Sequence, residues 1–251
     1  MYTAVPVKRG EQEKRKMIYT YAILLAPAPS DSLLGITSKQ IQYLQSDRLI
    51  AVIETDIDVE ALNHLPEQAL MQAIVQHDRL ICELFSDRTL LPLRFGTAFV
   101  SISALETYLK EESEKLCASL QRLDGYAEFL ITGSAIAPKS EAATKLKGKD
   151  YLLAKRSQYL QQEEWRSQLQ QEVLDYRQTL ISNLSSEINP EIYKPEFQHV
   201  ETQGSEDVRV YALLPRSQVE SLQQATRSWE QQHSHWQIAW SQALPPYHFL
   251  N

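Results

Sequence analysis

Glycine and cysteine are scarce in this sequence of 251 residues. The seven glycines do not cluster into a phosphate-binding loop, and the HExxH, CxxC and GxSxG patterns of common catalytic sites are missing. The two cysteines, Cys82 and Cys117, fall in predicted helices and are too few for a disulfide framework. They are therefore expected to be small buried side chains in a reducing compartment.

Positive charge and long apolar runs are also lacking. Lysine and arginine number 25 against 32 acidic residues, and the net charge of −7 argues against nucleic acid as a main partner. No apolar run reaches the roughly 18 residues that span a lipid membrane. Residues 1–16 are polar and mixed in charge, so we expect a disordered N-terminal extension and no signal peptide. The composition is typical of a cytoplasmic globular protein.

The first half of the chain predicts a modified ferredoxin-like α+β domain over residues 17–125. Ile18 to Leu25 is rich in aromatic and β-branched residues and predicts a strand. A short helix near Ser38 to Gln45 and a strand over Leu49 to Glu54 would complete a βαβ-like unit. A strong helix then opens at Glu67, with a stripe of Leu70, Ile74, His77, Ile81 and Leu84.

The stretch TLLPLRFGTAF, Thr89 to Phe99, predicts a strand that ends at Gly96, with Leu91, Leu93 and Phe95 alternating onto one face. Pro92 has no N–H for a neighbouring strand, so the strand lies at a sheet edge or bulge there. Gly96 permits a turn that a side chain would hinder. Arg94 points to the opposite face from its apolar neighbours, where it would bind an anion or, as we prefer, tie the strand to a helix.

A capped helix is predicted to follow this turn. Ser103 and Glu106 fit the capping-box spacing, and Asp124-Gly125 ends the helix. The expected buried stripe is Leu105, Leu109, Leu116, Leu120 and Leu123.

The second half predicts a ferredoxin-like βαββαβ domain over residues 126–251, with one long helix. Its strands are expected at Ala127 to Ile131, Phe197 to Thr202, Val208 to Leu214, and the alternating residues Trp236, Ile238 and Trp240. Gly133 to Asp150 is predicted to be a loop before the long helix Tyr151 to Leu184. A second capping box, Ser217 and Glu220, is expected to open a helix to about Gln232.

Histidine supplies the candidates for chemistry. His77 lies on an apolar helical stripe beside Asp78 and is either a general base or a buried structural histidine. The second interpretation is favoured because no nucleophile is placed beside it. His233 and His235 are expected to be two surface polar side chains, in preference to a metal site, because no cysteine or acidic ligand group accompanies them in the sequence. The tail Leu244 to Phe249 is apolar and aromatic, so it is expected to dock on its own domain or on a partner.

Four segments in order resemble the GvpF/GvpL family of gas vesicle proteins, and GvpF most. They are Tyr19-Thr20-Tyr21-Ala22, Leu90 to Thr97 (LLPLRFGT), Gly148 to Leu152 (GKDYL) and Leu244 to Phe249 (LPPYHF). Gln242 and Ala243 stand where the family pattern of the last segment has Gly-Pro. The resemblance implies a two-domain α+β protein that is located at gas vesicles and has no catalytic residues, cofactor or metal.

The resemblance also implies an accessory or minor structural role in gas vesicle assembly. The expected partners are the hydrophobic major shell protein and other accessory proteins, and neither nucleic acid nor a lipid membrane is expected to bind. The alternatives are a small-molecule sensor built on tandem ferredoxin-like domains, with Arg94 binding an anion, and an enzyme using His77. The residues expected to shape or make partner contacts are Pro92, Arg94, Phe95, Gly96, Pro245, Pro246, Tyr247 and Phe249.

Overall fold

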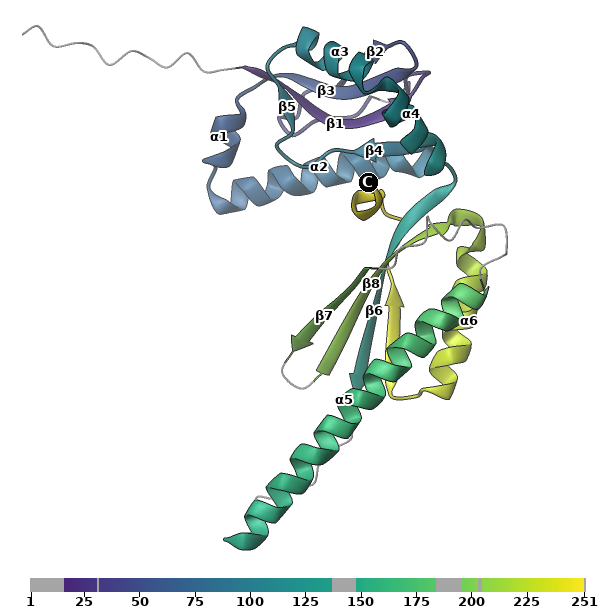
Figure 1. The fold of residues 1–251 in the computed structure, drawn as a ribbon. Helices are drawn as coiled ribbons and strands as arrows, with labels where there is room; N and C mark the ends of the chain where they lie inside the picture. The colour runs from purple at the N-terminus through teal and green to yellow at the C-terminus, as the bar shows by residue number, and fades with distance from the viewer. Residues whose placement is uncertain (1–15, 31, 137–147, 184–195, 203–204, 251) are drawn as a thin grey trace, which may run out of the picture. The chain divides into compact units, whose positions relative to one another are not determined.

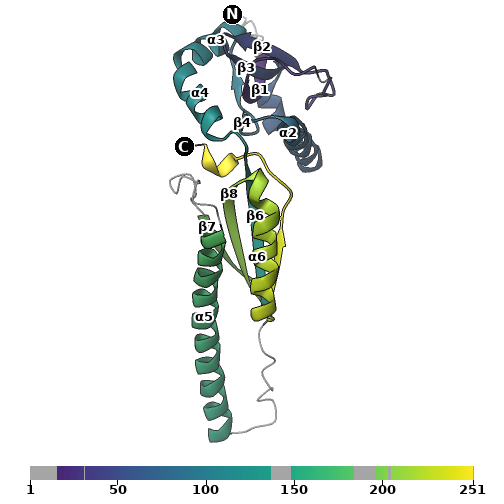
Figure 2. The same ribbon diagram turned by 90° about the vertical axis from the view of Figure 1, so that its right-hand side faces the viewer.

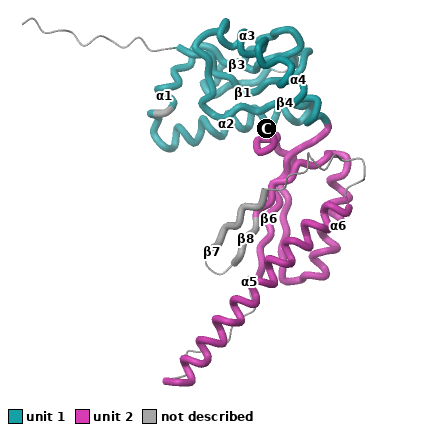
Figure 3. The backbone as a smooth tube through the Cα atoms, in the orientation of Figure 1, with its two compact units in different colours: residues 1–124 teal, residues 125–251 magenta. Residues whose placement is uncertain are grey.

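The computed structural model describes residues 16–30, 32–136, 148–183, 196–202 and 205–250 (Figure 1). The chain divides into two compact units, Met1–Asp124 and Gly125–Asn251 (Figure 3). Each unit contains one antiparallel sheet with helices, so the protein is of mixed α+β class. No helix within the described ranges has both the length and the apolar character needed to cross a membrane. The extension expected over residues 1–16 lies, apart from Lys16, outside the described residues.

The sheet of the first unit has five strands: β1 (Met17–Leu25), β2 (Gln42–Ser46), β3 (Leu49–Ile57), β4 (Leu90–Pro92) and β5 (Ala98–Phe99). Their order is β2-β3-β1-β4, and β5 pairs with the start of β1. The strand β1 is central because its residues are apolar or aromatic on both faces, and Tyr19 to Leu24 are all buried. The prediction that the strand holding Pro92 lies at a sheet edge is confirmed.

Four helices accompany this sheet: α1 (Val59–Asn63), α2 (Glu67–Asp87), α3 (Ile102–Glu111) and α4 (Ser113–Arg122). Figures 1 and 2 place α2 on one face of the sheet and α3 with α4 on the other. The stripe expected on α2 is buried at His77, Ile81 and Leu84, whereas Ile74 is 37 % exposed. The five leucines expected between Leu105 and Leu123 are all buried, as predicted.

Several local predictions for the first unit are wrong. Residues Gln42–Ser46 form β2 and not a helix, because they pair with Leu49–Ile53 in a hairpin, so the unit starts with antiparallel strands and not with a βαβ unit. The single helix expected between Ser103 and Asp124 is divided into two helices, α3 and α4, with Glu112 between them. Its cap is Ser101, whose Oγ accepts the Ala104 N–H at 3.1 Å, and not Ser103. The helix end at Gly125 is confirmed by the positive φ of 75° there.

The sheet of the second unit consists of β6 (Tyr126–Ile136), β7 (Glu196–Thr202), β8 (Ser205–Pro215) and β9 (Trp236–Trp240), in the order β7-β8-β6-β9. All of its neighbouring strands are antiparallel. Two long helices, α5 (Lys149–Asn183) and α6 (Val219–Gln232), lie on one face of this sheet (Figure 2). Short 3-10 turns η1 (Arg216–Gln218) and η2 (Tyr247–Phe249) complete the unit.

Two boundaries in the second unit differ from the prediction. The strand β6 continues to Ile136, so part of the expected loop Gly133 to Asp150 is strand, and residues 137–147 lie outside the described residues. The expected capping box is wrong, because Ser217 lies within η1 and α6 begins after Gln218 without a side-chain cap. Sequence pattern alone misses such a lead-in turn, because a capping box and a 3-10 turn both favour serine.

Candidate functional site

The motif LRFGT forms a tight turn between β4 and β5. The Thr97 N–H donates to the Arg94 carbonyl at 3.0 Å, and the Thr97 hydroxyl donates to the same oxygen at 2.7 Å. Gly96, the third residue of this turn, has φ +87°, which is the value that a type II turn requires and that glycine adopts without strain. The strand expected to run to Gly96 therefore ends at Pro92, and the alternation of Leu93 and Phe95 belongs to the turn.

Both sides of this turn are tied to His77 on α2. The Nε2 atom of His77 lies 3.0 Å from the Leu93 carbonyl oxygen, which can only accept, so Nε2 carries the hydrogen. The Nδ1 atom then accepts from the Tyr19 hydroxyl at 3.0 Å, and that hydroxyl accepts the Gly96 N–H at 3.1 Å. The chain of bonds fixes one tautomer of His77 and holds the turn at Leu93 and at Gly96.

Burial keeps the His77 ring neutral and the Tyr19 hydroxyl protonated. His77 is 3 % exposed, and burial lowers its pKa below the ordinary 6.5, although the Leu93 carbonyl and the Asp78 carboxylate oppose the shift. Burial also raises the pKa of Tyr19 to about 12, which keeps its hydroxyl protonated and able to donate. Both ring nitrogens of His77 are therefore engaged in the neutral ring, and the prediction of a buried structural histidine bonded to a carbonyl is confirmed.

We expect a measurable pH dependence from His77. Its pKa is lower in the folded protein than in the unfolded chain, so the unfolded chain binds more protons below about pH 6.5 and stability falls there. His77→Gln should lose less stability than the wild type between about pH 7.5 and about pH 5.5, because glutamine does not titrate. Urea unfolding at both pH values measures this. Equal losses in the two proteins would contradict a lowered pKa.

A second buried polar cluster lies on the same sheet face and was not predicted. The Tyr21 hydroxyl donates to Glu54 Oε2 at 2.6 Å and accepts the Ile36 N–H at 2.8 Å, and the Thr37 hydroxyl also donates to Glu54. Burial raises the pKa of Tyr21, and the bond to Glu54 raises it further. Gly35 suits this place, since a Cβ on it would clash with the Glu54 carboxylate and the Tyr21 hydroxyl. The cluster pins residues 35–37 to the sheet.

Three motif residues at this turn, Pro92, Arg94 and Phe95, are in different environments. Pro92 is buried, and Phe95 packs its ring 5.6 Å from the ring of His77 and 6.1 Å from that of Tyr19. Arg94 is exposed, and within the described part of the chain its guanidinium has no hydrogen bond or ion pair. The preferred interpretation of Arg94 as a tie to a helix is therefore not supported. Arg94 is the motif side chain that a partner can reach.

The C-terminal tail is held by Glu128, a 2 % exposed carboxylate near the start of β6. Glu128 and Leu244 exchange two backbone hydrogen bonds, of 3.0 and 2.8 Å. The carboxylate accepts from the His248 backbone N–H at 2.9 Å and from its Nδ1 at 2.7 Å, while the His248 ring stacks 3.8 Å from that of Tyr211. The tail thus docks on its own unit, and Pro245, Pro246 and Phe249 are buried.

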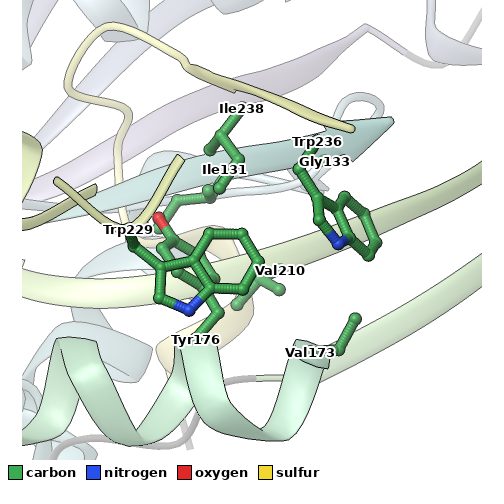
Figure 4. Close-up of a pocket in the computed structure, with 8 residues that line it drawn as sticks. All are labelled: Ile131, Gly133, Val173, Tyr176, Val210, Trp229, Trp236 and Ile238. Carbon is green, nitrogen blue, oxygen red and sulfur yellow. The ribbon is translucent and has the colours of Figure 1, made fainter. Parts of the chain in front are cut away.

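An apolar cavity lies between the second sheet and its helices (Figure 4). Its volume is about 20 Å³, enough for about one water molecule and too small for an organic ligand. The lining is Ile131, Gly133, Val173, Tyr176, Val210, Trp229, Trp236 and Ile238. It is a packing gap in the core, and it gives no support to a small-molecule site.

His233 and His235 are half-buried in the same unit, and the expectation that no acidic side chain lies near them is wrong for His235. His235 lies 2.7 Å from Glu172, which also accepts from the Trp236 indole at 2.7 Å. Burial alone would raise the Glu172 pKa, but its bonds to Trp236, Gln168 and His235 together lower it. His233 stacks 4.0 Å from the Trp229 ring. Among the side chains that the structure describes, no group of three or more His, Cys, Asp or Glu residues is placed to hold a metal ion.

Comparison with known proteins decides the family. The family model described as "Gas vesicle synthesis protein GvpL/GvpF" matches residues 17–251, which is almost the whole chain. This chain belongs to the GvpL/GvpF family. A role in gas vesicles follows from that membership, and the family resemblance of the sequence motifs is confirmed.

Solved GvpF structures share the fold of this GvpL/GvpF protein. The crystal structure of GvpF from Anabaena sp. PCC7120 has a TM-score of 0.69 and 16% identity, and the match covers 94% of this chain and 96% of that one. GvpF from Microcystis aeruginosa has a TM-score of 0.66 and 17% identity, with 94% of this chain and 99% of that one covered. No curated protein sequence matches the chain. At such identity the structural likeness establishes the fold alone.

Proposed function

We propose that this GvpL/GvpF protein binds the hydrophobic major shell protein of gas vesicles and supports its assembly, without catalysis of its own. The match of the family model over residues 17–251 carries this proposal. A shell subunit with an apolar surface is prone to aggregate until it is assembled, so an accessory protein that covers this surface would favour ordered growth. Other accessory proteins of the gas vesicle are the further partners expected.

An exposed apolar surface on the first unit suits such a partner. On α2, Met71 is 57 %, Ile74 is 37 % and Val75 is 58 % exposed, and these residues are neighbours on one side of the helix. Leu34, which is 52 % exposed, lies on a different flank of the same helix, where its carbonyl accepts from Gln76 of α2 at 2.9 Å. We call Met71, Ile74 and Val75 the α2 patch. A group of apolar side chains left in water is a feature of interaction sites.

The motif residues then divide by accessibility. Arg94 is proposed to contact a partner, since it is exposed. The remaining motif residues are proposed to fix the conformation of the turn and of the tail, and so the surface that a partner meets. They are Pro92, Phe95, Gly96, Pro245, Pro246, Tyr247 and Phe249.

The two compact units are proposed to be two ferredoxin-like domains, the first of them modified. In the second unit, the succession β6-α5-β7-β8-α6-β9 and the sheet order β7-β8-β6-β9 support this. The first unit differs by its β2-β3 hairpin and by the pair α3 and α4. The sensor alternative is not favoured, because Arg94 lies on an exposed turn and the apolar cavity is too small for a ligand.

Capture of the major shell protein tests the proposed function. Wild-type protein should retain it, and Met71→Glu/Val75→Glu should capture at least about tenfold less, because two charges are placed in the apolar contact. Val100→Glu/Ile102→Glu is the matched control, since Val100 and Ile102 are also exposed apolar residues of the first unit. Capture is measured by pull-down, and purified washed vesicles are then immunoblotted for this protein.

The outcomes separate the roles. Capture with retention on washed vesicles indicates a structural component, and capture without retention indicates an assembly factor. If the wild type captures no shell protein, the proposed function is wrong. If both double variants capture like the wild type, the function stands and the α2 patch is not the contact.

A further inference from the structure

The helix α5 has 35 residues, and its two halves differ in what surrounds them. Its buried residues Leu169, Tyr176 and Leu180 lie in the C-terminal half, against the sheet and α6. The N-terminal half runs beyond the sheet of its own unit (Figures 1 and 2). Helical residues with no core to cover are normally polar. An apolar surface on this half would therefore need another explanation.

Four large apolar side chains are exposed on this half: Leu152 (66 %), Leu153 (55 %), Tyr159 (62 %) and Leu160 (52 %). We call them the α5 outer face. The two pairs are seven residues apart, the spacing at which helices pack against other helices. Leu160 is nine residues before the buried Leu169, or half a turn around the helix at 3.6 residues per turn, so this face points away from the core side of α5.

Charge along α5 changes sign between its two segments. Residues 149–160 contain three basic and one acidic residue, whereas residues 161–176 contain four acidic and one basic residue. A parallel pair of such helices would place like charges together. An antiparallel pair places the basic end of each helix along the acidic middle of the other, which is favourable at both ends of a two-fold contact.

We propose that the Tyr159–Leu160 end of the α5 outer face binds the same residues of a second copy of this chain, in an antiparallel helix pair centred between Tyr159 and Leu160. In this arrangement Arg156 of one copy opposes Glu163 of the second copy, since both are equally distant from the centre. The two pairs of Tyr159 and Leu160 form an apolar centre, with one Arg–Glu pair on each side. The contact is of the self-complementary kind that makes two-fold dimers.

The second sheet leaves room for this contact. The sheet is attached to α5 through residues around Leu169 to Leu180, while the proposed overlap is centred near residue 160. Two antiparallel copies would therefore carry these sheets at opposite ends of the helix pair. One short helix pair buries a modest area, so we expect a dimer that forms and dissociates with concentration. This inference is independent of shell-protein binding and goes beyond the proposed function.

Analytical ultracentrifugation of the full chain over a range of concentrations tests the dimer. The wild type should show a monomer–dimer equilibrium, and Leu160→Glu should raise the dimer Kd at least about tenfold, because it places a charge in the apolar centre. Leu174→Glu is the matched control. Leu174 is 54 % exposed and lies on the same side of α5, two heptads after Leu160, but outside the overlap. This control should dimerise like the wild type.

A charge exchange tests the antiparallel register. Arg156→Glu and Glu163→Arg should each weaken the dimer, because each places like charges opposite one another. The double variant Arg156→Glu/Glu163→Arg should restore it. Circular dichroism of each variant checks that α5 is intact, so that loss of the dimer is not loss of the helix.

Three outcomes would overturn the proposal. A wild-type protein that stays monomeric at every concentration would assign the α5 outer face to a different partner. A Leu160→Glu variant that dimerises normally would place the contact elsewhere on the chain. A charge-exchanged double variant that remains monomeric would exclude the antiparallel register.

Discussion

Replacing His77 with leucine should destabilise the protein by about 3 kcal/mol, because it leaves two buried polar groups without partners. The Leu93 carbonyl loses its donor and the Tyr19 hydroxyl loses its acceptor, and leucine also removes the ring that packs against Phe95. For a unit of this size the melting temperature should fall by about 10 °C. Thermal and urea unfolding of the full chain measure the effect.

His64→Leu is the control for this substitution. His64 is exposed at the end of α1, so its replacement should change stability by less than about 0.5 kcal/mol. A double-mutant cycle with Tyr19→Phe then isolates the bond between Tyr19 and His77. If the two changes add without coupling, the hydroxyl and the ring do not bond.

The effect of His77 on the motif turn is separable from its effect on stability. Leu93 and Gly96, the residues at the two ends of the bond network, bracket Arg94. His77→Gln keeps a polar side chain at this position, so it should retain more stability than leucine. If Arg94 needs a fixed turn to contact a partner, His77→Leu should weaken partner binding more than His77→Gln does.

Periodicity in the sequence predicted the elements whose burial repeats regularly. The α2 stripe lies in the core from His77 onward, as do the leucines of α3 and α4, because apolar residues at steps of three and four have one face to bury. The strand β1 was also predicted, since Ile18 to Leu25 is aromatic and β-branched. Gly96 was predicted to lie at a turn, and its positive φ shows why glycine is required there.

Elements that depend on a distant partner were not predictable from local pattern. The strand β2 has only five residues, Gln42, Gln45 and Ser46 among them are polar, and it forms because β3 offers it hydrogen bonds. The helix cap was misplaced by two residues because Ser101 and Ser103 both suit this position, and only the backbone conformation distinguishes them. The break at Glu112 has no glycine or proline to signal it.

The partners of buried carboxylates were also not predictable from local sequence pattern. Glu54 and Glu128 lie inside apolar strands, and a carboxylate in such a place needs donors. That much could have been inferred from the sequence. The donors could not, because Tyr21 is 33 residues from Glu54 and His248 is 120 residues from Glu128. Long-range partners of this kind follow from the strand register.

The bond between Glu128 and His248 leads to a second large effect. Glu128→Ala should destabilise the protein by about 3 kcal/mol, because the His248 N–H and ring lose the acceptor that holds the tail. His248→Ala should cost about 2 kcal/mol, since the backbone bond to Glu128 remains but the ring bond and the stacking on Tyr211 are lost. Urea unfolding of the full chain measures both.

His235→Ala is the matched control for the tail histidine. His235 also lies 2.7 Å from a carboxylate, that of Glu172, but this carboxylate keeps its bonds from Trp236 and Gln168 when His235 is removed. The control should therefore cost about 1 kcal/mol. The comparison separates the loss of a histidine–carboxylate contact from the loss of the tail.

These values bear on whether the tail can also contact a partner. Deleting residues 244–251 removes the donors of a carboxylate that is 2 % exposed, so a loss of shell-protein capture in that deletion would report damage to the second unit. His248→Ala weakens the docking of the tail and leaves the tail residues in place. If it costs no more than His235→Ala, the tail is loosely held and its apolar residues are available to a partner. If it costs more and capture is unchanged, the tail serves the fold of its own unit.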